Sequence, residues 1–520
     1  MPKSYASLPR AISALSTALH YRPARFALAG LVFGVLSLAG YSVRPLPAFA
    51  PADTISVMRD PRLLSDMDRA IYTAIFDAQR NGDTSTVDTL ITQLDNQILL
   101  GHVLASRYMS EGYETNADEL VTWLQNYGDH PEAPRIASLA RRKGADMSET
   151  HVVSDTTPLK GDGYVFHLGR TTMPDGWYRG LRLWKEGQFA SAAESFSAVG
   201  ANEELNGWQR SAASYWAYRS QLRAGNKSAA NSQLAMAASE PLTFYGQLAL
   251  ARQGKAMPIR ATAPRVSYSL RNDPHVLRAS AFSALEMDKA AEMELRSLYG
   301  KLDITDRPGL VALASEMNLA NLQVRLARQP HLSDSEALFG SYPIPTAMIS
   351  ASEGIVQPAL VLAVARHESG FREGAVSGAG AAGIMQMMPA TAKAVMRHAQ
   401  LDLAEAGDSI VPIAKRLNDE VLSAKLGATY LQMLTKEKAI GSNLMKILAG
   451  YNAGPGAVAN WDKSARNMND PLLYLESIPY AETHNYVVQV MAHYWIYQNM
   501  MGQRPSSLDQ LARGEWPEIS

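Results

Sequence analysis

One glutamate, Glu368, is spaced so that it falls on the apolar face of a predicted helix. In VLAVARHESGF, residues 361–371, it shares one face of a predicted helix with three apolar residues: Val361, Val364 and Ala365. Pro358 can open this helix and Gly370 can end it. Burial and the helix dipole should both raise the pKa of Glu368, because each disfavours its charged form. Glu368 is therefore a candidate general acid, and the alternative is a buried glutamate in a salt bridge.

A glycine-rich segment, SGAGAAGIMQMMPATA, follows at residues 377–392. Its glycines permit tight turns or close approach of a ligand. Gln386 offers donors and acceptors to a polar ligand, and Met385 offers adaptable apolar surface. Because no Lys-Ser/Thr pair follows the glycines, a phosphate-binding P-loop is excluded. A zinc site of the His-Glu-x-x-His type would need a histidine where the chain has Phe371, so it is excluded as well.

Two later segments carry further polar groups. In AGYNAGPG, residues 449–456, a helix capped by Ser442 is expected to end and to expose Tyr451 and Asn452 on a rigid loop. Such groups suit a flat polar ligand such as a sugar, and a simple turn is the alternative.

The last of these segments is IPYAETHNYV, residues 478–487. Pro479 breaks the chain before a helix that should carry Glu482, Tyr486 and Val490 on one face.

Length and composition limit the class of protein. The 520 residues predict two to four domains, and 47% hydrophobic residues exclude a largely disordered chain. The 49 basic and 50 acidic residues give a net charge of −1, which argues against an extended nucleic-acid interface. Zero cysteines exclude disulfides, thiolate metal sites and a cysteine nucleophile.

The first fifty residues differ in composition from the rest. They contain five basic residues and no acid, an uncharged stretch at residues 26–43, and small residues at Ala48 and Ala50. This pattern predicts a secretory signal peptide over residues 1–50, and an uncleaved membrane anchor is the alternative.

Residues 51–338 are predicted to form a helical solenoid. In residues 184–199 a turn at Gly187 precedes one apolar helix face, and a similar unit turns at Gly225. Small alanines at facing positions favour stacked helical hairpins, and an irregular helical bundle is the alternative. The sequence FGSYPIP at residues 339–345 predicts a domain boundary.

The four chemistry-bearing segments, in this order, resemble the catalytic domain of the soluble lytic murein transglycosylases, relatives of goose-type lysozyme. The resemblance extends upstream to Tyr342-Pro343, to LTFYGQLAL at residues 242–250, and to GHVLASRYM and DHPEA between residues 101 and 133. It implies an all-α chain: a helical-hairpin superhelical solenoid, a lysozyme-like domain over residues 339–505, and a C-terminal tail over residues 506–520.

The resemblance also implies residue roles. Glu368 would be the catalytic acid/base. The residues implied to bind substrate or to support catalysis are Ser369, Met385, Gln386, Tyr451, Asn452, Glu482 and Tyr486. Among these, Met385 and Gln386 would line the sugar cleft, and Glu482 would be a buried supporting acid. The chain departs from the family's pattern at two positions, where His484 replaces a common arginine and Ser423 a common asparagine.

The implied reaction cleaves peptidoglycan between N-acetylmuramic acid and N-acetylglucosamine and forms a 1,6-anhydro sugar, with no metal or cofactor. The implied location is the periplasm, the partner is the glycan strand, and the solenoid is expected to bind other cell-wall enzymes or secretion machinery. Two alternatives remain: a goose-type lysozyme-like hydrolase, and a non-catalytic scaffold for cell-wall enzymes.

Overall fold

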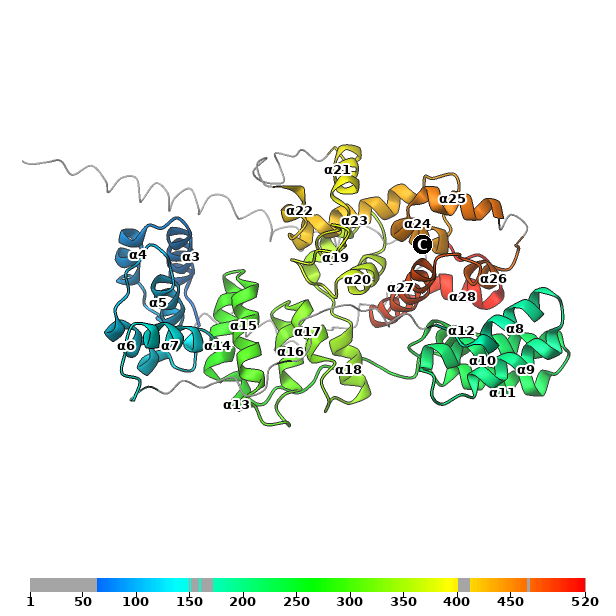
Figure 1. Cartoon of the computed structure of the whole chain (residues 1–520), viewed down its shortest axis with the longest axis horizontal. Coiled ribbons are helices and arrows are strands. Elements are labelled where there is room, and N and C mark those ends of the chain that lie inside the picture. The colour runs from blue at the N-terminus through cyan, green and yellow to red at the C-terminus, as the bar shows by residue number, and fades with distance from the viewer. Residues whose placement is uncertain are drawn as a thin grey trace, which may run out of the picture. The chain divides into compact units, whose positions relative to one another are not determined.

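The computed structural model describes residues 63–148, 150, 159, 172–400, 412–464 and 468–519. The predicted signal peptide lies outside this range. Within it the chain forms 26 helices, α3 to α28, and no strand, only three isolated bridges (Figure 1). The all-α prediction is confirmed. None of these helices is long and apolar enough to cross a bilayer.

Eighteen of the helices, α3 to α20, lead to the candidate acid. The first group is α3 Asp66–Arg80, α4 Thr84–Ile91, α5 Leu100–Tyr108, α6 Ala117–Tyr127 and α7 Ala133–Arg142. The second is α8 Asp175–Lys185, α9 Phe189–Gly200, α10 Gly207–Arg223, α11 Lys227–Ala238 and α12 Phe244–Arg252. The third is α13 Tyr268–Arg271, α14 Pro274–Ala284, α15 Asp288–Tyr299, α16 Gly309–Glu316, α17 Ala320–Leu326, α18 Asp334–Ser341, α19 Thr346–Ser352 and α20 Pro358–Glu368.

The remaining helices complete the C-terminal part. They are α21 Pro389–His398, α22 Ile413–Arg416, α23 Glu420–Leu434, α24 Leu444–Ala453, α25 Pro455–Ser464, α26 Pro471–Leu475, α27 Ala481–Met500 and α28 Ser506–Arg513. The last of them, α28, packs against α12, and the Arg252 guanidinium donates to the Ala512 carbonyl at 2.8 Å. The segment predicted as a tail is therefore ordered through residue 519.

The second group consists of helical hairpins, as the sequence predicts. Gly187 (φ +75°) turns the chain between α8 and α9, and Gly225 (φ +84°) turns it between α10 and α11. A side chain rarely adopts this left-handed conformation, so glycine is favoured at both turns. The alanines at the helix contacts are almost fully buried: Ala192, Ala193, Ala212 and Ala213. Their small size lets the helices approach closely.

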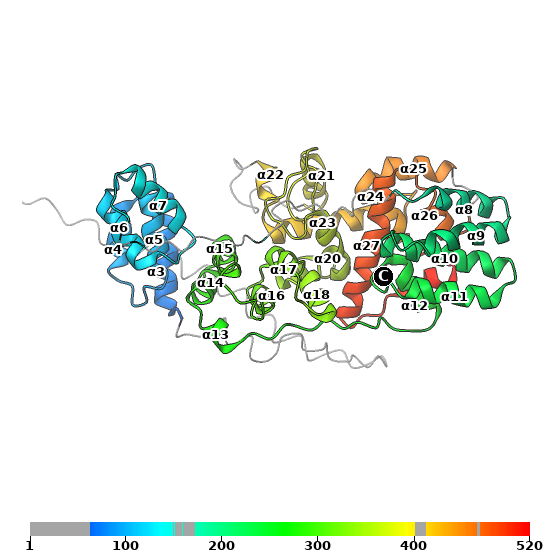
Figure 2. The ribbon, with the colours of Figure 1, turned by 60° about the horizontal axis from the view of Figure 1, so that its bottom comes forward.

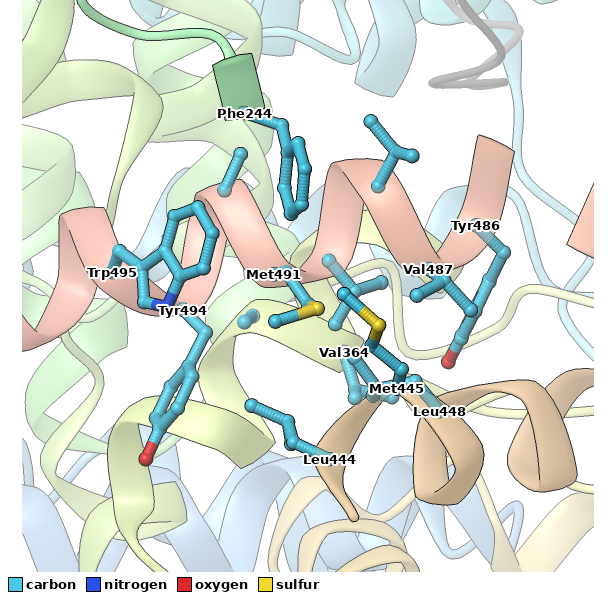
Figure 3. Close-up of a cluster of buried hydrophobic side chains, with 14 of the residues drawn as sticks. Phe244, Val364, Leu444, Met445, Leu448, Tyr486, Val487, Met491, Tyr494 and Trp495 are labelled. Carbon is cyan, nitrogen blue, oxygen red and sulfur yellow. The ribbon is translucent and has the colours of Figure 1, made fainter. Parts of the chain in front are cut away.

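One hydrophobic core joins these hairpins to the C-terminal helices. Phe244 of α12 stacks on Trp495 of α27 with ring centroids 5.0 Å apart, and Gln247 donates to the Ala492 carbonyl at 3.2 Å. In the close-up, Phe244 lies on one side of α27, while Val364 of α20 and Leu444 of α24 lie on the other (Figure 3). The long helix α27 therefore contacts both the hairpins and the candidate site.

The upstream segments GHVLASRYM and DHPEA meet in a buried network around Glu294 of α15. The fully buried Glu294 carboxylate lies 2.6 Å from His102 Nε2 and accepts from Arg278 Nε at 2.7 Å. His102 Nδ1 lies 3.0 Å from Glu132. Although burial raises the pKa of Glu294, hydrogen bonds from His102, His275 and Arg278 bring it below its usual range. The network ties α5 and α7 to α14 and α15.

Candidate active site

Glu368 is the last residue of α20. Pro358 occupies the first turn of this helix, and Gly370 (φ +58°) follows its end, as predicted. Every residue from Ala359 to Ala365 is fully buried, so the helix is apolar on all sides rather than on one face. Only at its C-terminal end does a polar side chain reach the surface, and Glu368 is partly exposed there.

The surroundings of Glu368 favour its protonated form. Burial raises its pKa to about 8, the Tyr486 hydroxyl lowers it in part, and the negative charge of Glu482 raises it. Glu368 forms no ion pair with any described residue, which disfavours the salt-bridge alternative. A carboxyl group with this pKa carries a proton at neutral pH and can act as a general acid.

Two tyrosines lie beside Glu368. The rings of Tyr451 and Tyr486 are stacked, with centroids 6.4 Å apart and planes 6° apart. The Tyr451 hydroxyl donates to the Met385 carbonyl at 2.9 Å. The buried Tyr486 hydroxyl has no partner at normal hydrogen-bonding geometry among the described residues, although it is close enough to lower the pKa of Glu368. His367 packs edge-on against the Tyr486 ring at 4.9 Å and limits its movement.

The glycine-rich segment folds back onto the end of α20. The Ser369 hydroxyl donates to the Ile384 carbonyl at 2.8 Å. Gln386 has φ +45°, and its side-chain Nε2 donates to the Gly383 and Ala375 carbonyls at 2.8 and 3.1 Å. Gly383 has φ +77°, and a Cβ there would lie 2.0 Å from the Leu417 carbonyl oxygen. These contacts give the segment one fixed path beside Glu368.

Met385 belongs to the core, because its side chain is fully buried against Gly427 of α23. Its backbone N–H donates to the Ser423 hydroxyl at 3.3 Å, and its carbonyl accepts from Tyr451. In this structure Met385 therefore contributes backbone groups to the site. Ser423, one of the two departures from the family's pattern, still supports the segment.

The expected exposed loop with Tyr451 and Asn452 is wrong, because both are partly buried in the last turn of α24. The helix continues to Ala453 and ends only at Gly454 (φ +84°). Its cap is Asn443, whose side chain accepts from the Lys446 N–H, rather than Ser442. Asn452 Oδ1 accepts from the Thr483 hydroxyl at 2.7 Å and so joins α24 to α27.

The expected burial of Glu482 is also wrong. Glu482 lies exposed in the first turn of α27, where a carboxylate is favoured by the helix dipole. The burial of α27 becomes continuous only from Tyr486 onward, so an acid one turn earlier remains in solvent. The negative charge of Glu482 raises the pKa of Glu368.

The sequence analysis overlooked one aromatic pair near these residues. Trp461 of α25 and Tyr480, directly before α27, have ring centroids 5.5 Å apart, and Tyr480 is 58% exposed. Tyr480 lies inside the segment IPYAETHNYV, and this position in the sequence could have identified it as a candidate. In the described ranges no cluster of His, Asp and Glu is arranged to hold a metal ion.

Comparison with known proteins shows what this chain is similar to. Residues 347–473 match the transglycosylase SLT domain. This range contains Glu368, the glycine-rich segment and α24. Two curated relatives are the soluble lytic murein transglycosylases of Salmonella typhimurium and Escherichia coli, each 27% identical over 278 and 267 residues. The chain therefore contains a match to the transglycosylase SLT domain and is similar over about half of its length to soluble lytic murein transglycosylases.

The similarity covers part of these relatives. The alignments span 52% and 51% of this chain and 41% and 40% of the relatives, so the chain matches about two fifths of their length. The fold extends further. The crystal structure of the 70 kDa soluble lytic transglycosylase of Escherichia coli has a TM-score of 0.54 at 20% identity, covering 90% of this chain and 75% of that one. A complex of the 70-kDa soluble lytic transglycosylase with bulgecin A has a TM-score of 0.53 at 19% identity, with the same coverage.

Proposed function

We propose that the chain is a peptidoglycan lytic transglycosylase with Glu368 as its acid/base. The observation that carries this proposal is a glutamate at the end of a buried helix inside the SLT domain, where burial raises its pKa to about 8. The substrate is the glycan strand, cleaved at the β-1,4 bond between N-acetylmuramic acid and N-acetylglucosamine.

One carboxyl group suffices for this reaction. Protonated Glu368 donates its proton to the glycosidic oxygen, and the bond from this oxygen to the anomeric carbon of the muramic acid breaks. The N-acetyl group of the same sugar stabilises the positive charge at that carbon. The Glu368 carboxylate then takes the proton of the 6-hydroxyl as its oxygen bonds to the anomeric carbon. The product is a 1,6-anhydro sugar, Glu368 ends protonated, and no water is consumed.

The neighbouring residues hold this carboxyl group in place. The stacked rings of Tyr451 and Tyr486 limit the space beside it, and the Ser369–Ile384 hydrogen bond fixes the end of its helix. The Tyr486 hydroxyl can stabilise the charged form of Glu368 after it has given up its proton, because a hydrogen bond favours the carboxylate. Gln386 is committed to its own loop through its Nε2, so its Oε1 is the side-chain atom that would contact sugar.

A hydrolase is the second candidate function, and the exposed position of Glu482 is the observation that favours it. Inverting glycosidases hold the attacking water with a second carboxylate. Glu482 is exposed and interacts with Glu368 electrostatically, so it is the acid that would hold such a water. The tethered 6-hydroxyl nevertheless has the advantage of an intramolecular reaction.

The location and partners follow from the substrate. We propose that the protein acts in the periplasm, where peptidoglycan lies, after export by the signal peptide predicted at residues 1–50. The helices before the SLT domain would hold the catalytic part and bind glycan strands, other cell-wall enzymes or secretion machinery.

The role of Glu368 is tested by Glu368→Gln. The amide keeps the shape but has no proton to give, so the release of muropeptides from purified sacculi should fall about 10²–10⁴-fold. Circular dichroism should show the same helix content. A folded variant that digests sacculi at nearly the wild-type rate would remove Glu368 from the mechanism.

A further inference from the structure

A separate cavity of about 370 Å³ lies beside the first turns of α27. The hairpin side contributes residues from α8, α10 and α12, and the other side is the chain from Glu476 to Gln489. The views agree that α8, α10 and α12 lie next to α26 and α27 (Figures 1 and 2), and the Arg219–Asp470 ion pair joins the two sides. The volume falls within the range of small-ligand sites.

The charged groups of this cavity are already paired with one another. The Tyr245 hydroxyl donates to Glu476, and His484 Nε2 lies 3.0 Å from the other Glu476 oxygen. Burial lowers the pKa of His484, but the charge of Glu476 raises it above its usual value. The side chain of Glu476 is 4% exposed. The resulting cluster is close to neutral, which makes the cavity a poor site for a strongly charged ligand.

One polar side chain in the cavity wall is not used by the protein. Gln489 is 5% exposed, yet its carboxamide makes no hydrogen bond to any described residue. It lines this cavity and a neighbouring one of about 600 Å³, and Trp208 lines both with it. The carboxamide atoms of Gln489 are not among the buried unpaired polar atoms, so they remain accessible, and a ligand that supplies one donor and one acceptor can pair with them.

Helical spacing connects this wall to the catalytic residues. Gln489 follows Glu482 by seven residues, which is two turns along the same stripe of α27, or about 10 Å. The cavity wall and the first turn of α27 beside Glu368 therefore belong to one rigid helix.

We propose that this cavity binds one N-acetylated hexosamine of a glycan strand, as a second carbohydrate site. The Gln489 carboxamide would pair with the acetamido group, and Trp208 and the 54% exposed Tyr178 would pack against the apolar face of the ring. A neutral sugar fits better than a peptide stem, because a stem brings free carboxylates to a cavity whose charges are paired. The inference rests on the proposed function for its choice of polymer.

The test places a probe at Trp208. The chain is labelled with 5-fluorotryptophan in a Glu368→Gln background, which prevents turnover, and Trp208→Phe identifies the ¹⁹F resonance of Trp208 among the eight tryptophans. The added ligand is the N-acetylglucosamine tetramer. The Trp208 resonance should shift saturably. Gln489→Leu should weaken that binding roughly two- to tenfold, the loss of about one neutral hydrogen bond. Gln233→Leu on α11, away from the cavity, is the matched control and should change nothing.

Three results would overturn the proposal. One is a Trp208 resonance that does not move while the tetramer saturates other tryptophans. A second is an equal response to cellotetraose, which lacks acetamido groups. The third is a response to the free stem tripeptide alone, which would assign the cavity to the peptide. If Trp208 responds as proposed but wild-type protein releases no 1,6-anhydro products, the second site stands and the proposed function fails.

Discussion

At the scale of single residues, burial and two neighbouring side chains determine whether Glu368 holds its proton. Burial is the largest influence on its pKa, the Glu482 charge acts in the same direction, and the Tyr486 hydroxyl acts in the opposite one. Because Glu482 and Tyr486 shift the pKa of Glu368 in opposite directions, removing one or the other should also move this pKa in opposite directions.

The pH profile of kcat/KM tests this balance. A general acid works only when protonated, so wild-type activity should fall as pH rises through about 8. Glu482→Gln removes a charge that raises the pKa of Glu368, so the decline should begin at lower pH. Tyr486→Phe removes a hydroxyl that lowers this pKa, so the decline should begin at higher pH. Measurements at constant ionic strength on soluble glycan fragments give both profiles.

An exposed glutamate that is not among the groups shifting the pKa of Glu368 provides the control for these profiles. Glu186→Gln, at the end of α8, changes the net charge by the same amount as Glu482→Gln and should leave the profile unmoved. Shifts of the same sign in the Glu482 and Tyr486 variants would contradict the account of Glu368.

Residue positions were predictable where helix periodicity decides them. The periodicity around Glu368 correctly indicated an apolar setting and a raised pKa. The exposure of Glu482 was not predictable, because periodicity gives the face of a residue but not the turn at which a helix emerges from its neighbours. Met385 shows a similar limit, since its burial depends on Gly427, which lies on a distant helix.

At the scale of elements, the glycine-rich segment needs glycine at one position and tolerates other residues at another. Gly383 combines a positive φ with close contact to the Leu417 carbonyl. Gly378 has neither constraint, because nothing lies within 4 Å of its Cβ position. The sequence shows both as glycines and cannot separate them.

Gly383→Ala should therefore destabilise the protein, and Gly378→Ala should not. The positive φ alone costs about 1–3 kcal/mol in an alanine, and the clash with the Leu417 carbonyl adds to this. Gly378→Ala should stay within about 0.5 kcal/mol of wild type. Urea unfolding followed by circular dichroism measures both, and equal stability of the two variants would show that this path of the segment is wrong.

Helix starts were predictable where proline marks them, at Pro358 and Pro389, because proline fits the first turn and not the interior. The end of α24 was predicted too early. Tyr451 and Asn452 looked like loop residues because glycine and proline follow them, but contacts with Met385 and Thr483 keep them in the last helical turn.

At the scale of the whole molecule, the helical hairpins and the catalytic helices share one core. Local periodicity predicted the hairpins, and the glycine and prolines of residues 339–345 predicted a boundary, but neither could reveal this shared core. The pairing of Phe244 with Trp495 joins residues about 250 positions apart, and helix α18 runs across the predicted boundary. The domain ranges 51–338 and 339–505 remain a prediction.

Phe244→Ala tests whether this core joins the two parts energetically. Phe244 is fully buried, so its truncation should cost about 3–5 kcal/mol. The loss should lower the unfolding temperature of the catalytic helices as well as of the hairpins. Tyr268→Ala, at a site 85% exposed, should have almost no effect. Calorimetry that shows the catalytic helices unfolding at an unchanged temperature would mean that the two parts are independent.

The most direct measurement of the central claim is the chemical form of the released muropeptides. Purified sacculi are digested with wild-type protein, and the products are analysed by mass spectrometry before and after borohydride reduction, with Glu368→Gln as the blank. Attack by the 6-hydroxyl predicts 1,6-anhydro products that are one water lighter than the hydrolytic ones and unchanged by borohydride. Mainly reducing ends that borohydride converts would contradict the account and identify a hydrolase, with Glu482 as the acid that holds the water.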